Sequence, residues 1–378
     1  MKRRRFAFST AAIAVVAFTS LAHSHAAEPA RKKPAPARVA RVARVAQPAK
    51  PAKAAPLQAD VLAREVREIT SKTGDAVCRI EADDEHGRLR GTGFFIDADG
   101  TLLTTYSVGG TSQDITVTVG EQRYPATRVI ADERVGIAVL KIVAERPVRF
   151  LKFGKSADLA LASPVVTLGY PLDLPLSPSF GLVAGLDIRT GVEGRFFATR
   201  HIRANLPVQG GQGGSPVMNL RGEAIGVLIS MVDGNSGIFA LPIEAAEKIL
   251  HDFRTHGRVR QGWVGVEVRP TNTPEHGSSA RVQTMREDCP AFVAGVRPGD
   301  LLLQVGAWKI TNAEDVMNAA FFVTATEPLA VRVSRGGKET KLTVMPLDPP
   351  NGTMPSIEKQ APTILGSSDE RKELNLRP

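Results

Sequence analysis

The chain has 378 residues, of which 43% are hydrophobic and 5% aromatic, so it can form two ordinary domains whose cores rest on aliphatic side chains. Its formal net charge of +9 is uneven: residues 1–57 hold twelve Lys and Arg against the single acid Glu28, and the rest is close to neutral. The basic composition therefore does not indicate a nucleic-acid partner, and we expect none.

The first 26 residues have the pattern of an export signal. Residues 2–5 are a basic start, residues 6–21 an apolar run, and the small residues Ser24 and Ala26 suit cleavage after Ala26. The alternative is an uncleaved membrane anchor, which the shortness of the run and its Ala, Ser and Thr content disfavour. We expect an exported protein, tethered to a membrane if the signal is retained.

Residues 27–57 consist almost entirely of Ala, Pro, Lys, Arg, Val and Gln. Such a stretch cannot bury enough apolar area to offset the entropy lost on ordering, so we predict a disordered basic linker. Its charge would allow weak contact with anionic envelope polymers or lipid. A plain solvated spacer is the alternative.

Residues 58–256 read as a β domain between two helices. Apolar residues at helical spacing predict helices at 58–72 and 243–254. Many short β runs lie between them, and the turn at residues 97–100 indicates a hairpin. The pattern predicts a barrel or sandwich. The expected strands are residues 76–80, 93–96, 102–105, 115–119, 126–130, 138–142, 164–168, 180–188, 196–202, 216–220, 224–229 and 237–242.

Residues 257–348 form a second, smaller unit, and residues 349–378 are a polar tail that we expect to be disordered. The second unit combines β runs with one helical segment, expected at residues 312–322. Its expected strands are residues 263–269, 280–285, 301–305, 329–334 and 339–344.

Five motifs of the first unit occur in a fixed order. They are Gly91-Thr-Gly-Phe-Phe, Ala138-Val-Leu-Lys-Ile, Leu168-Gly-Tyr-Pro, Gly211-Gln-Gly-Gly-Ser-Pro and Phe239-Ala-Leu-Pro. In this order they resemble the hairpin before the catalytic His, the strand after the catalytic Asp, a loop of the IGNP type, the nucleophile loop and the closing strand of the HtrA (DegP-like) family of periplasmic serine proteases. The resemblance implies a trypsin-like double β-barrel.

Two motifs of the second unit resemble those of PDZ domains. They are Gly262-Trp-Val-Gly-Val266, similar to the carboxylate-binding loop, and Cys289-Pro-Ala-Phe-Val-Ala-Gly-Val-Arg-Pro-Gly-Asp300, similar to the SPAxxAGLxPGD signature. The fold expected for the whole chain is mostly β, a double barrel followed by a PDZ domain. The resemblance also implies a location in the periplasm or cell envelope, and it leaves a homo-oligomer open.

The resemblance places the catalytic triad at three positions that lack its chemistry. The family's His, Asp and Ser correspond here to Ser107, Gly136 and Gly213. A triad needs a nucleophile, a base and a carboxylate, and loss of one member commonly costs on the order of 10⁴-fold in turnover. We therefore assign no catalytic residue. The amides of Gly211 and Gly213 could still form an oxyanion-binding loop.

A displaced catalytic set has one candidate nucleophile, Ser215, two positions beyond Gly213; the alternative is that Ser215 packs locally. His86 and His201 are candidate bases, which we interpret instead as solvated or strand-edge histidines. No His, Cys or carboxylate cluster has metal-ligand spacing, so we expect neither a metal nor a cofactor. Cys78 and Cys289 fall in different units and suggest two buried, unpaired residues.

A PDZ domain binds an extended peptide as an added strand and holds its terminal carboxylate in a loop of main-chain amides. The resemblance assigns this role to the first loop and edge and to the facing helix, with Trp263 as either a groove wall or a core residue. We expect protein C-termini or extended, unfolded peptides as partners. The assigned residues are Gly262, Trp263, Val264, Gly265, Val266, Val316, Ala320 and Val323.

These observations favour a chain that is not an enzyme, a catalytically inactive HtrA-like pseudoprotease acting as a peptide-binding adaptor or sensor in the cell envelope. The alternative is an active serine endopeptidase for protein quality control, with non-standard catalytic residues. A third hypothesis makes the basic linker the main element, as a tether to anionic envelope polymers.

Overall fold

The computed structural model describes residues 58–85, 87–189, 196–232 and 237–350. The predicted export signal, the basic linker, His86 and the predicted tail beyond residue 350 lie outside these residues. No helix within the described ranges is both long and apolar enough to span a membrane.

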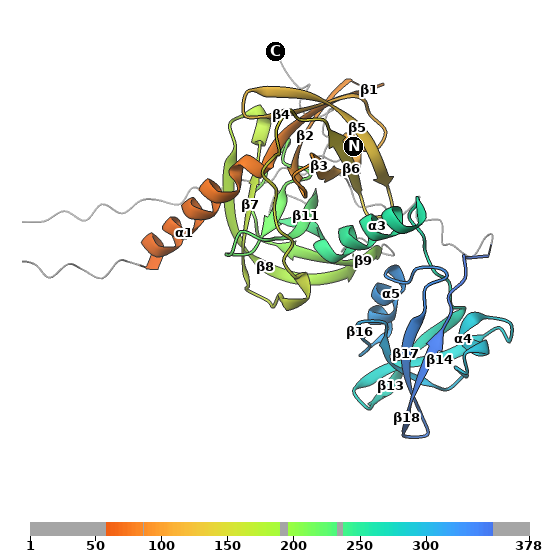
Figure 1. The fold of residues 1–378 in the computed structure, drawn as a ribbon. Helices are drawn as coiled ribbons and strands as arrows, with labels where there is room; N and C mark the ends of the chain where they lie inside the picture. Colours follow the sequence, from red (N-terminus) through yellow and green to blue (C-terminus); the bar gives the residue numbers. More distant parts are fainter. Residues whose placement is uncertain (1–57, 86, 190–195, 233–236, 351–378) are drawn as a thin grey trace, which may run out of the picture. The chain divides into compact units, whose positions relative to one another are not determined.

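Six antiparallel strands close a first barrel in the order β1-β2-β3-β6-β5-β4, drawn in orange to gold in Figure 1. Its interior is filled by Ile80, Phe95, Leu102 and Leu140, all fully buried. The predicted turn at residues 97–100 forms because Asp97 Oδ1 accepts the Thr101 N–H over 2.9 Å. The strands are β1 Val77–Asp84, β2 Gly87–Phe95, β3 Thr101–Thr105, β4 Gln113–Val119, β5 Gln122–Asp132 and β6 Ile137–Ile142.

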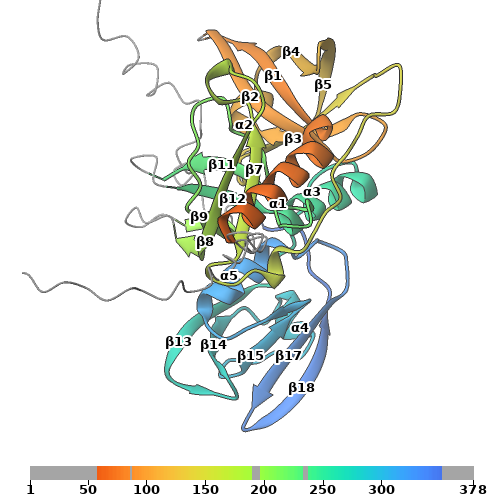
Figure 2. The same ribbon diagram turned by 90° about the vertical axis from the view of Figure 1, so that its left-hand side faces the viewer.

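A second six-stranded barrel follows in the order β10-β11-β12-β9-β8-β7, with its green strands beside the first barrel in Figure 2. Val165, Ile202, Val217 and Leu228 lie in its core. The strands are β7 Pro164–Gly169, β8 Ser177–Arg189, β9 Phe196–Ala204, β10 Pro216–Met218, β11 Ala224–Met231 and β12 Ile238–Pro242.

The two barrels share an apolar core that positions the loops between them. Phe94 and Leu103 of the first barrel belong to the same buried cluster as Leu168 and Met218 of the second. Burial of such residues contributes roughly 1.5–3 kcal/mol for each side chain. Ile69, near the end of the first helix, packs on the same cluster. The helices of this domain are α1 Gln58–Thr73, α2 Tyr106–Gly109 and α3 Ile243–His256.

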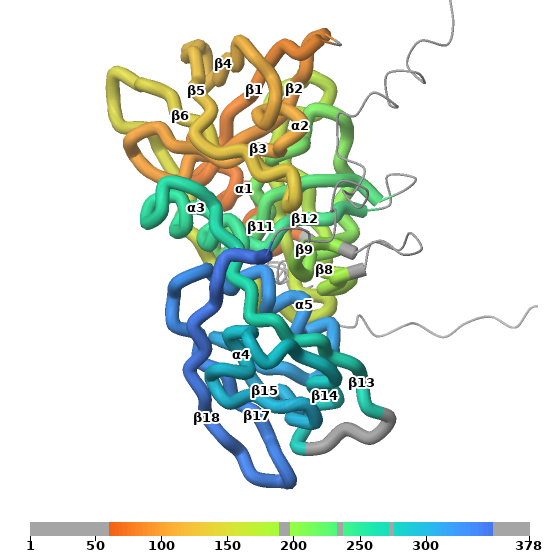
Figure 3. Tube along the Cα trace, turned by 90° about the vertical axis from the view of Figure 1, so that its right-hand side faces the viewer, coloured from red at the N-terminus to blue at the C-terminus, as the bar shows by residue number. Residues whose placement is uncertain are grey.

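The second domain is a sheet in the order β13-β14-β15-β17-β18, with β16 paired to β15, seen with its two helices in Figure 3. Helix α5 packs on β13 and β14, and it begins where Asn312 Oδ1 accepts the Asp315 N–H over 2.9 Å. The elements are β13 Val266–Glu275, β14 Ser278–Met285, α4 Pro290–Val293, β15 Leu301–Val305, β16 Trp308–Lys309, α5 Ala313–Phe321, β17 Leu329–Arg335 and β18 Lys338–Val344.

The predicted fold class, a double barrel followed by a PDZ domain, is confirmed. Cys78 and Cys289 are free and buried, as predicted. Burial raises the pKa of the Cys78 thiol, so this residue is held in its unreactive thiol form.

Gly214 and Gly120 provide a matched test of packing at the loop before β10. Both have a positive φ, but a Cβ at Gly214 would overlap Thr92 O and lie 2.6 Å from Thr104 Oγ1, whereas Gly120 has nothing within 4 Å. We expect Gly120→Ala to lower the free energy of unfolding by about 1–2 kcal/mol. Gly214→Ala should cost about 1–3 kcal/mol more, because the loop must move. Urea unfolding of both variants measures the difference, and equal losses would contradict the tight packing of this loop.

Candidate functional site

The three positions matched to the catalytic triad come from three elements of the double barrel. Ser107 lies in α2, Gly136 in the turn between β5 and β6, and Gly213 in the loop before β10. The Tyr106 N–H donates to Gly136 O and the Thr92 N–H donates to Gly213 O, each over 2.8 Å. The main chain therefore holds α2 against the β5–β6 turn, and β2 against the loop before β10.

Gly91 connects these two contacts. A Cβ at this residue would lie 2.8 Å from Val108 Cγ2 and 3.3 Å from Gly213 O. Since Val108 follows Ser107 in α2, the helix and the loop before β10 meet over Gly91. The structure thus gathers the three positions at the junction of the barrels, where they supply one hydroxyl and no imidazole or carboxylate.

The hydroxyl of Ser107 is engaged within its own segment. Its Oγ donates to Thr105 Oγ1 over 3.0 Å, and the side chain is half-buried. A serine hydroxyl cannot act as a general base near neutral pH, so Ser107 does not replace the imidazole of a triad.

Two amides of the loop before β10 remain available to a ligand. The carbonyls of Gly211 and Gly213 are held by Thr92, whose Oγ1 donates to Gly211 O over 2.9 Å and whose N–H donates to Gly213 O. The N–H groups of Gly211 and Gly213 have no acceptor among the described residues. A pair of preorganised amides two residues apart is the arrangement that stabilises an oxyanion in acyl transfer. The sequence alone did not indicate that Thr92 fixes this loop.

Ser215 lies at the end of the same loop and is fully buried. Its Oγ has no hydrogen-bond partner among the described residues, and it packs so closely on Gly169 that a Cβ there would overlap it. The Ser215 N–H donates to Gln212 O over 3.1 Å. In this conformation the hydroxyl is closed off from solvent, so attack on a substrate requires the loop to open.

The prediction that His201 is a solvated or strand-edge residue is wrong. Its side chain is only 1% exposed, its Nδ1 lies 2.8 Å from Thr199 O, and its ring stacks on Phe197 with centroids 3.8 Å apart. Burial lowers the pKa of His201 from 6.5 to about 4, so the imidazole is neutral near pH 7. The hydrogen bond and the stacking partner both belong to β9, which places His201 in the wall of the second barrel.

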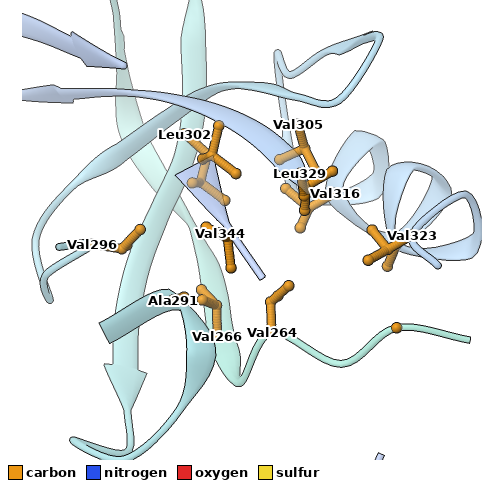
Figure 4. A pocket seen from close by; sticks show the side chains of 13 residues that line it. Val264, Val266, Ala291, Val296, Leu302, Val305, Val316, Val323, Leu329 and Val344 are labelled. Atoms are coloured by element: carbon orange, nitrogen blue, oxygen red, sulfur yellow. The ribbon is translucent and has the colours of Figure 1, made fainter. Parts of the chain in front are cut away.

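An apolar cavity lies in the PDZ domain, between α5 and the sheet (Figure 4). Its volume is about 100 Å³, and every side chain that lines it is aliphatic or is the hydrogen of a glycine. Of the predicted binding residues, six line the cavity and two, Trp263 and Gly265, do not. The lining residues are Gly262, Val264, Val266, Ala291, Val296, Leu302, Val305, Val316, Ala320, Val323, Leu329, Val331 and Val344.

Seven of these lining residues were missed from the sequence. They come from α4, from the segment after it and from the strands β15, β17 and β18, and five of them are buried core residues while Val305 and Leu329 are partly buried. The alternation of apolar residues along those strands shows which side chains point inward. It does not show which inward side chains leave space between them.

Two further free amides occur at the mouth of this cavity. The Gly262 N–H donates to Val323 O and the Trp263 N–H to Leu347 O, each over 2.7 Å. The N–H groups of the next two residues, Val264 and Gly265, have no acceptor among the described residues. Gly265 has a φ of 78°, and a Cβ there would overlap Cys289. A left-handed residue beside free amides forms a concave anion-binding turn.

Strand β13 follows this turn and is the first strand of its sheet. Within the described residues it pairs with β14 on one side, and no strand pairs with its other side. Such an edge can accept an extended peptide as an additional strand. Residues 262–275 therefore supply the free amides, part of the cavity lining and the open edge of the sheet.

Family models match both domains. A trypsin-like peptidase domain model matches residues 91–227, and a PDZ domain model matches residues 262–345. The first match runs from within β2 to within β11 and the second includes β13 to β18, and both agree with the observed fold.

Curated relatives include two bacterial proteins, each named "Probable periplasmic serine endoprotease DegP-like". The protein from Bartonella henselae is 31% identical over 277 residues, which cover 68% of this chain and 54% of the relative. The protein from Pseudomonas fluorescens is 28% identical over 304 residues, which cover 76% of this chain and 61% of the relative. The chain thus spans somewhat more than half the length of each.

A solved structure of the HtrA-type protease AlgW with a tripeptide matches with a TM-score of 0.60 at 22% identity. The match covers 76% of this chain and 99% of AlgW. At this level of identity it supports the fold alone.

The comparisons contradict the prediction that the chain is not an enzyme, because both curated relatives are named serine endoproteases. That prediction was based on the residues at the three triad positions, Ser107, Gly136 and Gly213, and gave little importance to the oxyanion-binding loop. The structure keeps the free amides of Gly211 and Gly213, and in this fold the oxyanion site and substrate binding alone retain about 10³–10⁴-fold catalysis over water.

His201 makes the stability of the chain depend on pH. The pKa of His201 is about 4 in the folded chain and 6.5 in the unfolded chain. Between these pH values the unfolded chain therefore binds a proton at this residue, whereas the folded chain does not. The stabilisation is complete above pH 6.5 and falls as the pH decreases, and the stability lost by pH 4 is about 3 kcal/mol.

Urea unfolding at pH 7 and pH 4.5 checks this expectation. His201→Phe, which keeps a flat ring and removes the titration, should lose less stability between the two pH values than the natural chain does. His276→Asn, a change at an exposed histidine, is the control and should behave like the natural chain. Equal pH dependence in all three proteins would contradict the role assigned to His201.

Proposed function

We propose that this chain, which has the trypsin-like peptidase domain and the PDZ domain of the HtrA (DegP-like) family, binds the C-termini of proteins or extended, unfolded peptides through its PDZ domain. One observation carries the proposal: the free amides of Val264 and Gly265 stand at the mouth of an aliphatic cavity. A terminal carboxylate accepts from such amides, while the last side chain of the peptide is buried.

The peptide would lie along β13. Its main chain would pair with the open edge of that strand, and Val316 and Ala320 of α5 would flank it on the other side. Alternate side chains of an added strand point the same way, so the terminal residue enters the cavity and its neighbour faces solvent. Affinity would come from the main chain and specificity from the cavity.

The proposed location is the cell envelope. The relatives from Bartonella henselae and Pseudomonas fluorescens are named periplasmic, and the sequence predicts an export signal in residues 1–26. Signal cleavage, contact of the basic linker with anionic polymers or lipid, and assembly into a homo-oligomer stay predictions.

A second proposed activity is serine endopeptidase cleavage with non-standard catalytic residues. The names of the relatives support it, and so do the free amides of Gly211 and Gly213. Ser215 is the proposed nucleophile, because it ends the loop that carries these amides. Its hydroxyl is buried against Gly169, so the proposal requires the loop to open on substrate binding. Turnover should be slow, since Ser107 and Gly136 supply neither a base nor a carboxylate.

Peptide binding is tested by filling the groove. Ala320 lines the cavity from the exposed face of α5, so Ala320→Phe adds bulk where the peptide lies and leaves the core unchanged. We expect the variant to lose about tenfold or more in affinity for a peptide with a free C-terminal carboxylate. Met317→Phe adds a ring to a 42% exposed residue of the same helix outside the cavity and should bind normally. Equal affinity of both variants would contradict the location of the site.

Endopeptidase activity is tested with the purified full chain and unfolded casein over long incubations. We expect slow cleavage that Ser215→Ala abolishes and Ser107→Ala leaves intact. Cleavage that survives Ser215→Ala but is lost in Ser107→Ala would transfer the role of nucleophile to Ser107. Casein that stays intact with the natural chain would refute the endopeptidase proposal, while the peptide-binding proposal would stand on its own measurement.

A further inference from the structure

A row of charged and polar side chains crosses four strands of the PDZ domain. Gln304 of β15 pairs with Lys309 of β16 on one side and with Arg332 of β17 on the other. Arg332 pairs in turn with Lys341 of β18, and Figure 3 shows β15, β17 and β18 side by side. Residues paired directly across antiparallel strands project to the same face of the sheet. The four side chains therefore form one row that spans three strand spacings, roughly 14 Å.

The row lies on the outer face of the sheet. Val331 and Val333, which flank Arg332 in β17, are buried in the core of the domain, whereas Lys309 and Lys341 are exposed. Successive residues of a strand project to opposite faces, so the row faces solvent. Val331 also lines the cavity beside α5. The row and the peptide cavity are therefore on opposite faces of one sheet, and each can bind a ligand independently of the other.

The folding of the domain does not account for this row. Like charges placed directly opposite each other destabilise a sheet, and Arg332 and Lys341 are such a pair. Glu339 Oε2 lies 3.3 Å from Arg332 Nη1 and offsets one positive charge. Lys309 and Lys341 have no ion-pair partner among the described residues. Three cations and one carboxylate leave the row with a net charge of +2.

A hollow beside the row provides room for an anion. Ala330 and Thr343 pair directly next to Arg332 and Lys341, and both have short, exposed side chains. The hollow has a volume of about 370 Å³, and these four residues and Gln304 are among those that line it. Arg332 Nε has no hydrogen-bond partner among the described residues, although the atom is buried. Such a donor favours the binding of an acceptor, because an unpaired buried donor carries an uncompensated desolvation cost.

The direction of the row restricts the shape of a ligand. The row runs at right angles to the strands, so a peptide added to the edge of β18 would run parallel to that strand and reach only Lys341. The side chains on one side of an extended acidic peptide repeat at about 7 Å, more than the spacing of about 4.8 Å between neighbouring strands. A chain of linked phosphate groups carries negative charge at every unit and can contact all three cations. Arg and Lys both suit phosphate, the first through its forked donors and the second as a point charge.

We propose that the outer face of this sheet binds a linear polyphosphate, an anion with several phosphate groups linked in one chain, through Lys309, Arg332 and Lys341. Its negative charges would remove the repulsion between Arg332 and Lys341 and supply an acceptor for Arg332 Nε. The proposal does not depend on peptide binding by the cavity, because the two sites use opposite faces of the sheet.

Nuclear magnetic resonance on the purified full chain tests the proposal with inorganic tripolyphosphate at low ionic strength, where charges are screened least. We expect the main-chain amide signals of Gln304, Arg332 and Lys341 to shift. Orthophosphate should bind about tenfold more weakly, because a single phosphate contacts fewer cations. Shifts confined to the basic residues 27–57 would overturn the proposal. If hexaglutamate shifts the same three signals at lower concentrations than tripolyphosphate does, the ligand is an acidic protein and the polyphosphate proposal is refuted.

Two lysines of β18 provide a matched pair of variants. Lys341→Gln removes one cation of the row and should raise the dissociation constant for tripolyphosphate about fivefold, measured through the Arg332 signal. Lys338→Gln removes the same charge from an exposed residue of the same strand that does not line the hollow, and it should bind like the natural chain. Lys309→Gln, at the other end of the row, is a second variant and should weaken binding similarly. Equal losses in Lys338→Gln and Lys341→Gln would mean that net charge alone attracts tripolyphosphate, and the proposed site would be wrong.

Discussion

Thr92 connects the two barrels at the point where their loops meet. It is fully buried. Its N–H donates to Gly213 O, its Oγ1 donates to Gly211 O and accepts the Tyr170 N–H, and its own carbonyl accepts from Thr104 Oγ1. Its N–H and Oγ1 thus fix two loops of the second barrel, while its carbonyl binds β3 of the first barrel. Thr92 therefore holds the carbonyls of Gly211 and Gly213, the same two residues whose N–H groups have no acceptor among the described residues.

The two candidate sites share one feature, a pair of main-chain N–H groups without acceptors among the described residues, although the sites lie in different domains. In each, a short loop presents two main-chain N–H groups without acceptors: Gly211 and Gly213 in the double barrel, and Val264 and Gly265 in the PDZ domain. Main-chain amides of a packed loop can bind a carboxylate or a developing oxyanion without any charged side chain. The sites differ in what lies beside the amides, since the PDZ loop adjoins an aliphatic cavity and the other loop adjoins the buried hydroxyl of Ser215.

The error about enzymatic function has a physical origin. A sequence displays the residue at a matched position, so Ser107, Gly136 and Gly213 are conspicuous as losses. It does not display whether a loop amide is satisfied, because that depends on the partner of each carbonyl and amide in space. His201 was misjudged for the same reason, since its place in the pattern of β9 does not reveal how closely Phe197 covers it.

The sequence by itself determined the order of the domains, most strand positions and both long helices. Strand β15 lies where the apolar run at residues 301–305 predicts it, and α3 begins at Ile243 as expected. These features follow from local periodicity and turn residues, which act within a few positions. The closure of each barrel, the free amides and the cavity between α5 and the sheet were decided only by tertiary structure. They depend on residues far apart in the chain, such as Thr92 with Gly211 and Val264 with Val323, whose meeting no local pattern specifies.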